Sequence, residues 1–279
     1  MKNKLLPLIF TFLFLLSACG EGEESPQSGI TSLTASDVSV ETTSGENNSS
    51  EESTVISENS DNLESSELSE DFLIDDGEFY IPYLKADEEI DFSNAPKAEI
   101  LLYPWNSDYT PYAYAQLVFR ENDGFYLFMY CEESNPKTEV TQIGGEVYRD
   151  SALEFFCNYY PEGKEDRYPS TYVNLEMNSA GVYLANYRNY PLNALSGARV
   201  TVTGETFDGY WTVSAKIPLK LLKDLYRTVE FKRGSFVECN FTKCGSGTDI
   251  PHWGTWQLLP GETPNFHQPE YFKRVEIRR

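Results

Sequence analysis

The chain has 279 residues and a formal net charge of −22, and 40% of its residues are hydrophobic. So large an excess of acid disfavours a nucleic-acid-binding protein, because polyanionic nucleic acids are repelled by an acidic surface. The length provides for one domain of about 200 residues with a substantial apolar core, in addition to a polar segment near the N-terminus.

The N-terminus has the layout of a secretory signal peptide. Two lysines precede a short apolar run, Leu5 to Leu16, which is too short to span a bilayer comfortably. The sequence Leu16-Ser17-Ala18-Cys19 at its end resembles the bacterial lipobox, in which cleavage leaves the cysteine as a lipid-modified N-terminus. We therefore expect residues 1–19 to be a lipoprotein signal peptide, with Cys19 carrying the acyl chains that anchor an extracytoplasmic protein to the cell membrane. An ordinary signal peptide with an incidental cysteine is the alternative.

Residues 20–75 differ in composition from the rest of the chain. Between residues 20 and 71 there are fourteen Asp or Glu, no Lys or Arg and no aromatic residue. Such a segment cannot bury enough apolar surface to offset its ordering entropy, and its like charges keep it extended. The composition predicts a disordered, Ser- and Thr-rich acidic tether between the membrane and the following domain. An acidic partner-binding tail is the alternative.

The remaining residues, 76–279, are predicted to form one all-β domain. Two hairpins are indicated by turn sequences: Glu121-Asn122-Asp123-Gly124 joins residues 113–120 to 125–131, and Asp208-Gly209 joins residues 199–207 to 210–217. Further strands are expected over residues 152–160, 172–177, 182–187, 236–243 and 275–277, with one short helix over 219–225. Many strands, one minor helix and no strand–helix alternation predict an antiparallel β-sandwich of the jelly-roll kind.

Four cysteines follow the proposed lipid anchor: Cys131, Cys157, Cys239 and Cys244. Outside the cytoplasm an even number permits two disulfides, in three alternative pairings. A zinc site is a further alternative, because the last two cysteines lie near His252 and His267, but their spacing matches no common zinc pattern. We expect no cofactor, although a structural calcium ion is compatible with the sequence.

Five segments resemble, in the same order, strands and loops of the family-9 carbohydrate-binding modules. They are Asp150 to Phe156, Thr171 to Asn178, Trp211 to Pro218, Glu238 to Gly245 and Pro264 to Phe272. The resemblance covers roughly residues 80–279. It implies a β-sandwich that binds sugars, in the best understood members by holding a chain end between two aromatic rings. It also implies a polysaccharide or oligosaccharide ligand and, as partners, glycoside hydrolases.

The resemblance further implies a ligand site. The two rings would be Tyr148, which we prefer to Val147, and either Phe266 or His267. Glu154 would be a carboxylate that accepts hydrogen bonds from sugar hydroxyls. Tyr172 and Thr242 stand where the family has an arginine and a glutamine. The chemistry is general, because the apolar C–H face of a pyranose packs on a flat ring while carboxylates and amides take its hydroxyls.

Three further residues are candidates from their own positions. Trp253 and Trp256 flank a Gly-Thr pair in a loop-like segment, and we expect at least one of them to line the site. Arg149 either pairs with a nearby carboxylate, Asp150 or Glu154, or donates to a sugar hydroxyl.

The sequence contains no recognisable catalytic constellation. A Gly-x-Ser-x-Gly elbow, a phosphate loop and a dinucleotide fingerprint are all absent, and pairs of acids are too common to indicate a glycoside hydrolase. We therefore expect a binding protein rather than an enzyme. The alternatives are a sandwich that binds haem or a protein partner, with His252, His267 and Met177 as candidate haem ligands, and, less favoured, a glycoside hydrolase.

Overall fold

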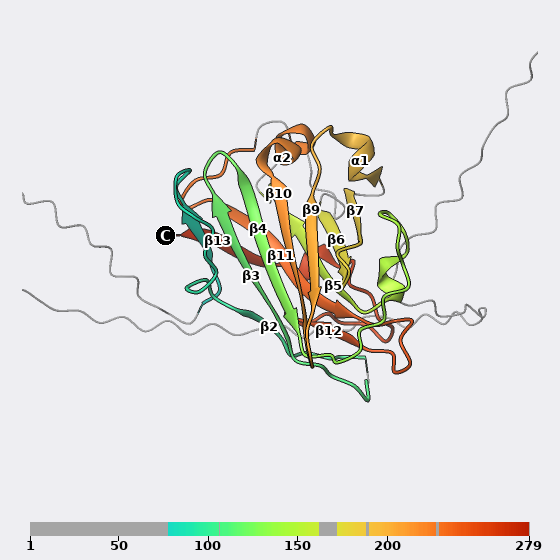
Figure 1. The fold of residues 1–279 in the computed structure, drawn as a ribbon. Coiled ribbons are helices and arrows are strands. Elements are labelled where there is room, and N and C mark those ends of the chain that lie inside the picture. The colour runs from blue at the N-terminus through green and yellow to red at the C-terminus, as the bar shows by residue number, and fades with distance from the viewer. Residues whose placement is uncertain (1–77, 106, 162–171, 188–189, 227–228, 279) are drawn as a thin grey trace, which may run out of the picture. The chain divides into compact units, whose positions relative to one another are not determined.

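The computed structural model describes residues 78–105, 107–161, 172–187, 190–226 and 229–278. The predicted signal peptide, the lipid-anchor cysteine Cys19 and the predicted tether lie outside these residues. Strands make up most of the regular structure (Figure 1). Within the described residues, no helix has both the length and the apolar character needed to cross a lipid bilayer.

The regular structure of the described residues consists of strands, two helices and two 3-10 turns. The strands are β1 (Ile81–Leu84), β2 (Ala98–Ile100), β3 (Ala113–Arg120), β4 (Gly124–Cys131), β5 (Ala152–Asn158), β6 (Val173–Asn178), β7 (Tyr183–Tyr187), β8 (Tyr190–Pro191), β9 (Thr201–Thr206), β10 (Trp211–Pro218), β11 (Phe236–Cys244), β12 (Trp253–Thr255) and β13 (Lys273–Arg278). The helices are α1 (Leu192–Leu195) and α2 (Leu219–Tyr226), and two 3-10 turns are η1 (Val147–Arg149) and η2 (Pro269–Tyr271).

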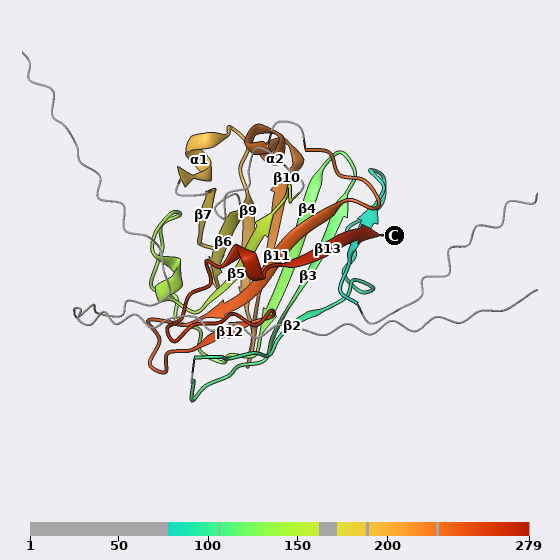
Figure 2. The same cartoon turned by 180° about the vertical axis from the view of Figure 1, so that it is seen from behind.

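The strands form two layers, which we call the front sheet and the back sheet (Figures 1 and 2). The front sheet has the order β1-β3-β4-β10-β9, with β2 beside β3, and the back sheet has the order β8-β7-β6-β5-β11-β13, with β12 beside β11. Strand β1 links them, because it pairs with both β13 and β3. The predicted all-β sandwich is confirmed.

Two details differ from the prediction. Strand β1 is parallel to both of its neighbours, so the sandwich is not purely antiparallel. Helix α1 is a second helix, and it spans only four residues after Pro191, without a side-chain cap. So short a helix completes hardly more than one turn and therefore shows no helical periodicity in the sequence.

Side-chain alternation places the main core between the two sheets. In β10, Trp211, Val213 and Ile217 are buried whereas Ser214, between them, is exposed. The back sheet is covered on both faces: Phe155 of β5 packs into the main core, whereas its neighbour Phe156 belongs to a second apolar cluster. This second cluster covers the outer face of the back sheet, and most of the predicted site residues lie there.

The four cysteines are buried and free in the structure, so neither of the two disulfides that the sequence permits is formed. Cys157 and Cys239 lie opposite each other on β5 and β11. Burial raises the pKa of the Cys131 thiol to about 12, which suits a small apolar core residue rather than a nucleophile. The zinc alternative has no support either, since no group of three or more His, Cys, Asp or Glu able to hold a metal occurs among the described residues.

The β3–β4 hairpin is held by a charged network around Asp123. The turn places Asn122 in the left-handed region, at a φ of 59°, which asparagine tolerates better than most residues. The Asp123 carboxylate accepts hydrogen bonds from Arg120 and Tyr126 and pairs with Lys216 of β10. Burial alone would raise the pKa of Asp123, but the hydrogen bonds from Lys216, Tyr126 and Arg120 outweigh it and lower the pKa to about 2.

Asp123→Asn is expected to lower the free energy of unfolding at pH 7 by about 1–2 kcal/mol, because it weakens a partly exposed charge-assisted network. The folded pKa lies below the unfolded value, so the wild-type contribution is fully present above about pH 4 and is lost as the pH falls toward 2. Denaturant titrations at pH 7, 4 and 3 measure this, with the exposed hairpin residue Asp208→Asn as the control. If the difference in unfolding free energy between wild type and Asp123→Asn stays constant as the pH falls, the lowered pKa of Asp123 is contradicted.

Candidate functional site

A row of polar side chains crosses the outer face of the back sheet. Thr242 of β11 lies opposite Glu154 of β5, which lies opposite Glu176 of β6. Residues paired in this way point to the same face of a sheet, so the three side chains are neighbours. Thr242 Oγ1 donates to Glu154 Oε2 at 3.1 Å, and Asn174 Nδ2, one alternation along β6, donates to Glu176 Oε1 at 2.9 Å. We call Thr242, Glu154, Glu176 and Asn174 the polar row.

Aromatic side chains from four separate segments pack against the second apolar cluster on this face. They are Tyr148 in η1, Tyr172 just before β6, Trp253 in β12 and His267 in the loop before η2, and we call them the aromatic rim. The Tyr172 hydroxyl is 2.6 Å from His267 Nδ1, and the His267 ring meets Phe156 edge-on at 5.2 Å. Burial, and then the nearby charges of Glu270 and Glu176, raise the pKa of Tyr172, so its hydroxyl is protonated at neutral pH.

The two tryptophans that the sequence left open point to opposite sides of the segment that begins with β12. Trp253 pairs with Cys244 of β11 and shares the face of the polar row. Trp256, three residues later, faces the other way and packs against Phe79 at 4.9 Å and Phe241 at 5.5 Å. The buried Trp253 Nε1 has no hydrogen-bond partner among the residues that the structure describes. Of the two, therefore, only Trp253 lies with the other predicted site residues.

Two predicted site residues make contacts within the protein, one of them buried and the other on the surface. Phe266 is 1% exposed and packs edge-on against Trp105 at 5.7 Å and Phe156 at 6.3 Å, so His267 is the member of this pair that borders the site. Arg149 Nε pairs with Glu146 at 3.0 Å, a carboxylate that was not among the two, Asp150 and Glu154, considered from the sequence. The Asp150 carboxylate instead accepts the backbone N–H groups of residues 139 and 140, each at 2.9 Å.

Two members of the polar row, Asn174 and Glu176, were not predicted as site residues from the sequence. Their signal is the alternation in β6, which places both on the same face as the predicted residue Tyr172. All six residues of β6 are buried, so a polar residue at every second position means that this face of the sheet has a polar interior.

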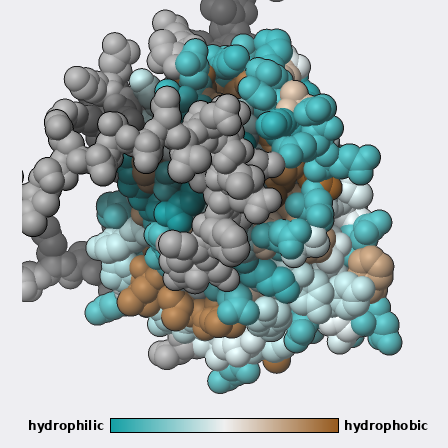
Figure 3. Space-filling model, turned by 90° about the vertical axis from the view of Figure 1, so that its left-hand side faces the viewer, coloured by the Kyte–Doolittle hydropathy of each residue, from teal (hydrophilic) through white to brown (hydrophobic). Residues whose placement is uncertain are grey.

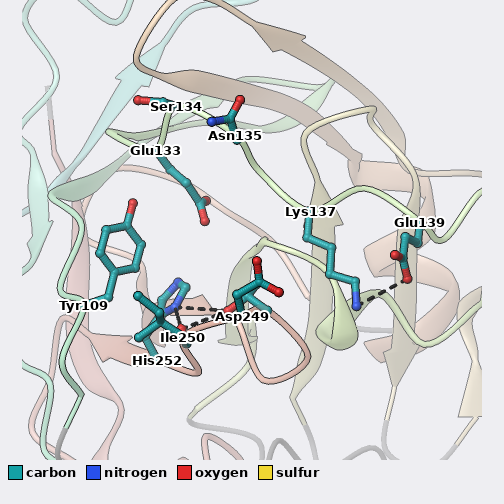
Figure 4. Close-up of a pocket in the computed structure, with 10 residues that line it drawn as sticks. Tyr109, Glu133, Ser134, Asn135, Lys137, Glu139, Asp249, Ile250 and His252 are labelled. Carbon is teal, nitrogen blue, oxygen red and sulfur yellow. Dashed lines mark hydrogen bonds and ion pairs between the residues drawn. The ribbon is translucent and has the colours of Figure 1, made fainter.

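A separate cleft of about 530 Å³ lies among three loops at one end of the sandwich (Figure 4). It is lined by Tyr109 before β3, by Glu133, Ser134, Asn135, Lys137 and Glu139 after β4, and by Thr248, Asp249, Ile250 and His252 between β11 and β12. We call it the Glu133 cleft. Its residues do not overlap with the polar row or the aromatic rim.

A buried ion pair forms one wall of the Glu133 cleft. The Glu133 carboxylate accepts hydrogen bonds from Ser151 Oγ at 2.8 Å and Trp211 Nε1 at 3.0 Å, and Lys243 Nζ lies 3.4 Å away. Burial would raise the pKa of Glu133, but the Lys243 charge and the two hydrogen bonds lower it, so Glu133 is ionised at neutral pH. Burial and the same lysine lower the pKa of His252 to about 4, so this imidazole is neutral.

The neutral His252 has a defined tautomer. Its Nδ1 donates to the Ile250 carbonyl at 2.8 Å, which leaves Nε2 to accept a hydrogen bond from Lys243 Nζ at 2.8 Å. Gly245 packs flat against the imidazole, and a Cβ there would lie 2.2 Å from His252 Cε1. Any larger residue at position 245 would therefore displace His252 and disturb the buried pair behind it.

A mostly antiparallel β-sandwich with a polar, aromatic-rimmed face defines a ligand-binding module, and comparison with known proteins identifies its family. A family model described as carbohydrate-binding family 9 matches residues 85–277. The chain therefore belongs to carbohydrate-binding family 9. This is a family of binding modules and not of enzymes, in agreement with the non-catalytic role predicted from the sequence.

Solved structures share the fold. One is a protein from Bacteroides uniformis described as carbohydrate-binding, with a TM-score of 0.55 and 21% identity over 72% of this chain and 99% of that one. Another is a family-9 carbohydrate-binding module from Caldicellulosiruptor kristjanssonii in complex with cellotriose, with a TM-score of 0.51 and 13% identity over 72% of this chain and 93% of that one. The comparison with curated proteins gave no match.

Proposed function

We propose that the chain is an extracytoplasmic lipoprotein that binds a polysaccharide or oligosaccharide through the polar row and the aromatic rim. Cys19 would anchor it to the cell membrane, and residues 20–75 would hold the module away from the lipid surface. The bound carbohydrate would be presented to glycoside hydrolases that act nearby. The single observation that carries the proposal is the polar row under an aromatic rim, in a chain that belongs to carbohydrate-binding family 9.

The arrangement suits a sugar for chemical reasons. Carboxylates at Glu154 and Glu176 accept hydroxyl protons, and the Trp253 indole N–H offers a buried donor that a sugar oxygen would satisfy. Ring faces of the rim would pack on the C–H face of a pyranose. Both carboxylates are 1% exposed, so binding includes a movement of rim side chains away from them. This chemistry requires no cofactor.

A glycan array probed with the full chain tests the function, and the hits are then titrated by tryptophan fluorescence. Trp253→Ala is expected to weaken binding about tenfold, because a stacked ring and a hydrogen-bond donor are lost. Phe207→Ala, which removes an exposed ring at the edge of the front sheet, is the control and should bind as wild type does. Unchanged affinity in Trp253→Ala contradicts the proposed site, and a chain that binds no glycan contradicts the function.

The haem alternative receives no support from the candidate ligands. Met177 is buried in the main core, His252 is hydrogen-bonded to Lys243, and His267 to Tyr172. We expect the purified chain to show no Soret band, and a Soret band would contradict the carbohydrate proposal. As for a protein partner, the hydrophobic side chains on the side in Figure 3 gather mainly in one strip near its lower left, with hydrophilic side chains around it.

A further inference from the structure

We propose that the Glu133 cleft is a second saccharide-binding site, selective for uncharged sugar units. The inference rests on the proposed carbohydrate function of the chain, and it concerns a different place in the fold. A cleft of about 530 Å³ falls within the range of about 300–1,000 Å³ that is usual for small-molecule sites.

The two sites lie on opposite faces of the same strands. Thr242 points to the outer face of the back sheet with Glu154, and its neighbour Lys243 points the other way, toward Glu133 and the cleft. The loop between β11 and β12 lies between the two sites. Ser246 at its start donates to the carbonyl of Tyr148 in the aromatic rim, whereas Asp249, further along the same loop, lines the Glu133 cleft. A sheet and a loop therefore stand between the two sites, so each can be filled or removed independently of the other.

The cleft offers polar side chains that have no other role in the fold. Ser134, Asn135 and Asp249 line it, and none of them makes a side-chain hydrogen bond or ion pair with the described residues. Together they provide a hydroxyl, an amide and a carboxylate, which match sugar hydroxyls because those both donate and accept. Figure 4 shows the side chains of Tyr109, Glu133 and Asp249 around one space.

Tyr109 supplies the apolar wall that a pyranose needs. Its ring meets the His252 imidazole edge-on, with centroids 5.0 Å apart and planes at 87°, so the ring is held in one orientation. A flat ring beside several hydrogen-bonding groups is the usual combination in a site for a polar ligand with one apolar face.

The charges of the cleft exclude acidic sugars. Glu133 is paired with Lys243, Glu139 is paired with Lys137 at 3.3 Å, and His252 is neutral, so these groups cancel. Asp249 has no ion-pair partner among the described residues and leaves the cleft with one net negative charge. A uronate carboxylate placed beside Asp249 would be repelled, whereas a neutral sugar would not.

Calorimetric titration of the full chain tests the proposal, with glucose, cellobiose and mannobiose as neutral probes and digalacturonate as the acidic probe. The cleft variant is Asn135→Ala with Asp249→Ala, and its control is Asn193→Ala with Asp208→Ala, which are exposed residues outside the cleft. Glu154→Gln weakens the polar-row site, so that this site stays empty at the probe concentrations used. We expect two molecules of a neutral probe per wild-type chain, one per chain in Glu154→Gln, and binding at least tenfold weaker when the cleft substitutions are added to Glu154→Gln.

The outcomes separate the two proposals. If wild type binds only one molecule of a neutral probe and the cleft variant binds it with the same affinity, the second site is overturned and the proposed function remains. Wild type that binds none of the neutral probes overturns the second site, whereas the glycan array decides the proposed function separately. If digalacturonate binds the Glu154→Gln variant as tightly as the neutral probes do, the proposed selectivity for uncharged sugars is overturned. Loss of the second equivalent in the cleft variant, with the control unaffected, supports the inference.

Discussion

Replacing Lys243 by methionine is expected to lower the free energy of unfolding by about 3–5 kcal/mol, since removal of one partner leaves a buried charge uncompensated. Lys243 is fully buried in β11, where Nζ lies 3.4 Å from the Glu133 carboxylate, 2.8 Å from His252 Nε2 and 3.0 Å from the Cys244 carbonyl. Methionine keeps the length of the side chain but supplies neither the charge nor a donor. The decrease in unfolding free energy therefore measures the lost electrostatic contacts more than lost packing.

Denaturant titrations of Lys243→Met and of the double variant Lys243→Met/Glu133→Gln measure the effect. The double variant should recover part of the loss, because it also removes the uncompensated carboxylate. Lys220→Met, which breaks an exposed pair with Asp224 on α2, is the control and should change stability by less than about 1 kcal/mol. Wild-type stability in Lys243→Met would mean that the buried pair contributes nothing.

The pH dependence of this loss has a definite sign. In wild type the pKa of Glu133 is lowered, so its contribution is present above the ordinary carboxyl pKa. In Lys243→Met the pKa of the same buried carboxyl should be raised, because desolvation then has no opposing charge. The difference in stability between the two proteins should therefore shrink as the pH falls through the ordinary carboxyl range.

The strands that the sequence predicted well are those with clear alternation. Residues 113–120 match β3 in both bounds, and 236–243 matches β11 to within one residue, because long runs with turn signals at their ends define their own limits. Strands β1, β2, β8 and β12 were not predicted, since two to four residues show no period. Their pairing is a property of the assembled sheets, and so is the parallel direction of β1.

The candidate site, too, was predicted from the sequence only in part. The resemblance to family 9 supplied Glu154 and Thr242, and the structure places them in contact. Whether Trp253 or Trp256 faces this site depends on which residue of β12 pairs with Cys244, and no local pattern contains that register. The Glu133–Lys243 pair joins the end of one sheet to the other, so it is visible only after folding.

Glu154→Gln is expected to weaken saccharide binding at the polar row about 10- to 100-fold, because hydrogen bonds to a charged group contribute about 1.5–3 kcal/mol. The substitution keeps the shape of the side chain, and an amide oxygen can still accept the hydrogen bond from Thr242. One charged acceptor is nevertheless replaced by a donor. A sugar hydroxyl that donates to Glu154 would then face an N–H group, so the loss should appear in affinity more than in stability.

Titration of the glycans that bind wild type measures this effect, with the unfolding free energy measured in parallel. Glu205→Gln is the matched control, since it makes the same chemical change at an exposed strand position on the front sheet. We expect Glu205→Gln to bind as wild type does and both variants to unfold within about 1 kcal/mol of it. Equal affinity of Glu154→Gln and wild type at the polar row would remove Glu154 from the ligand contacts of that site.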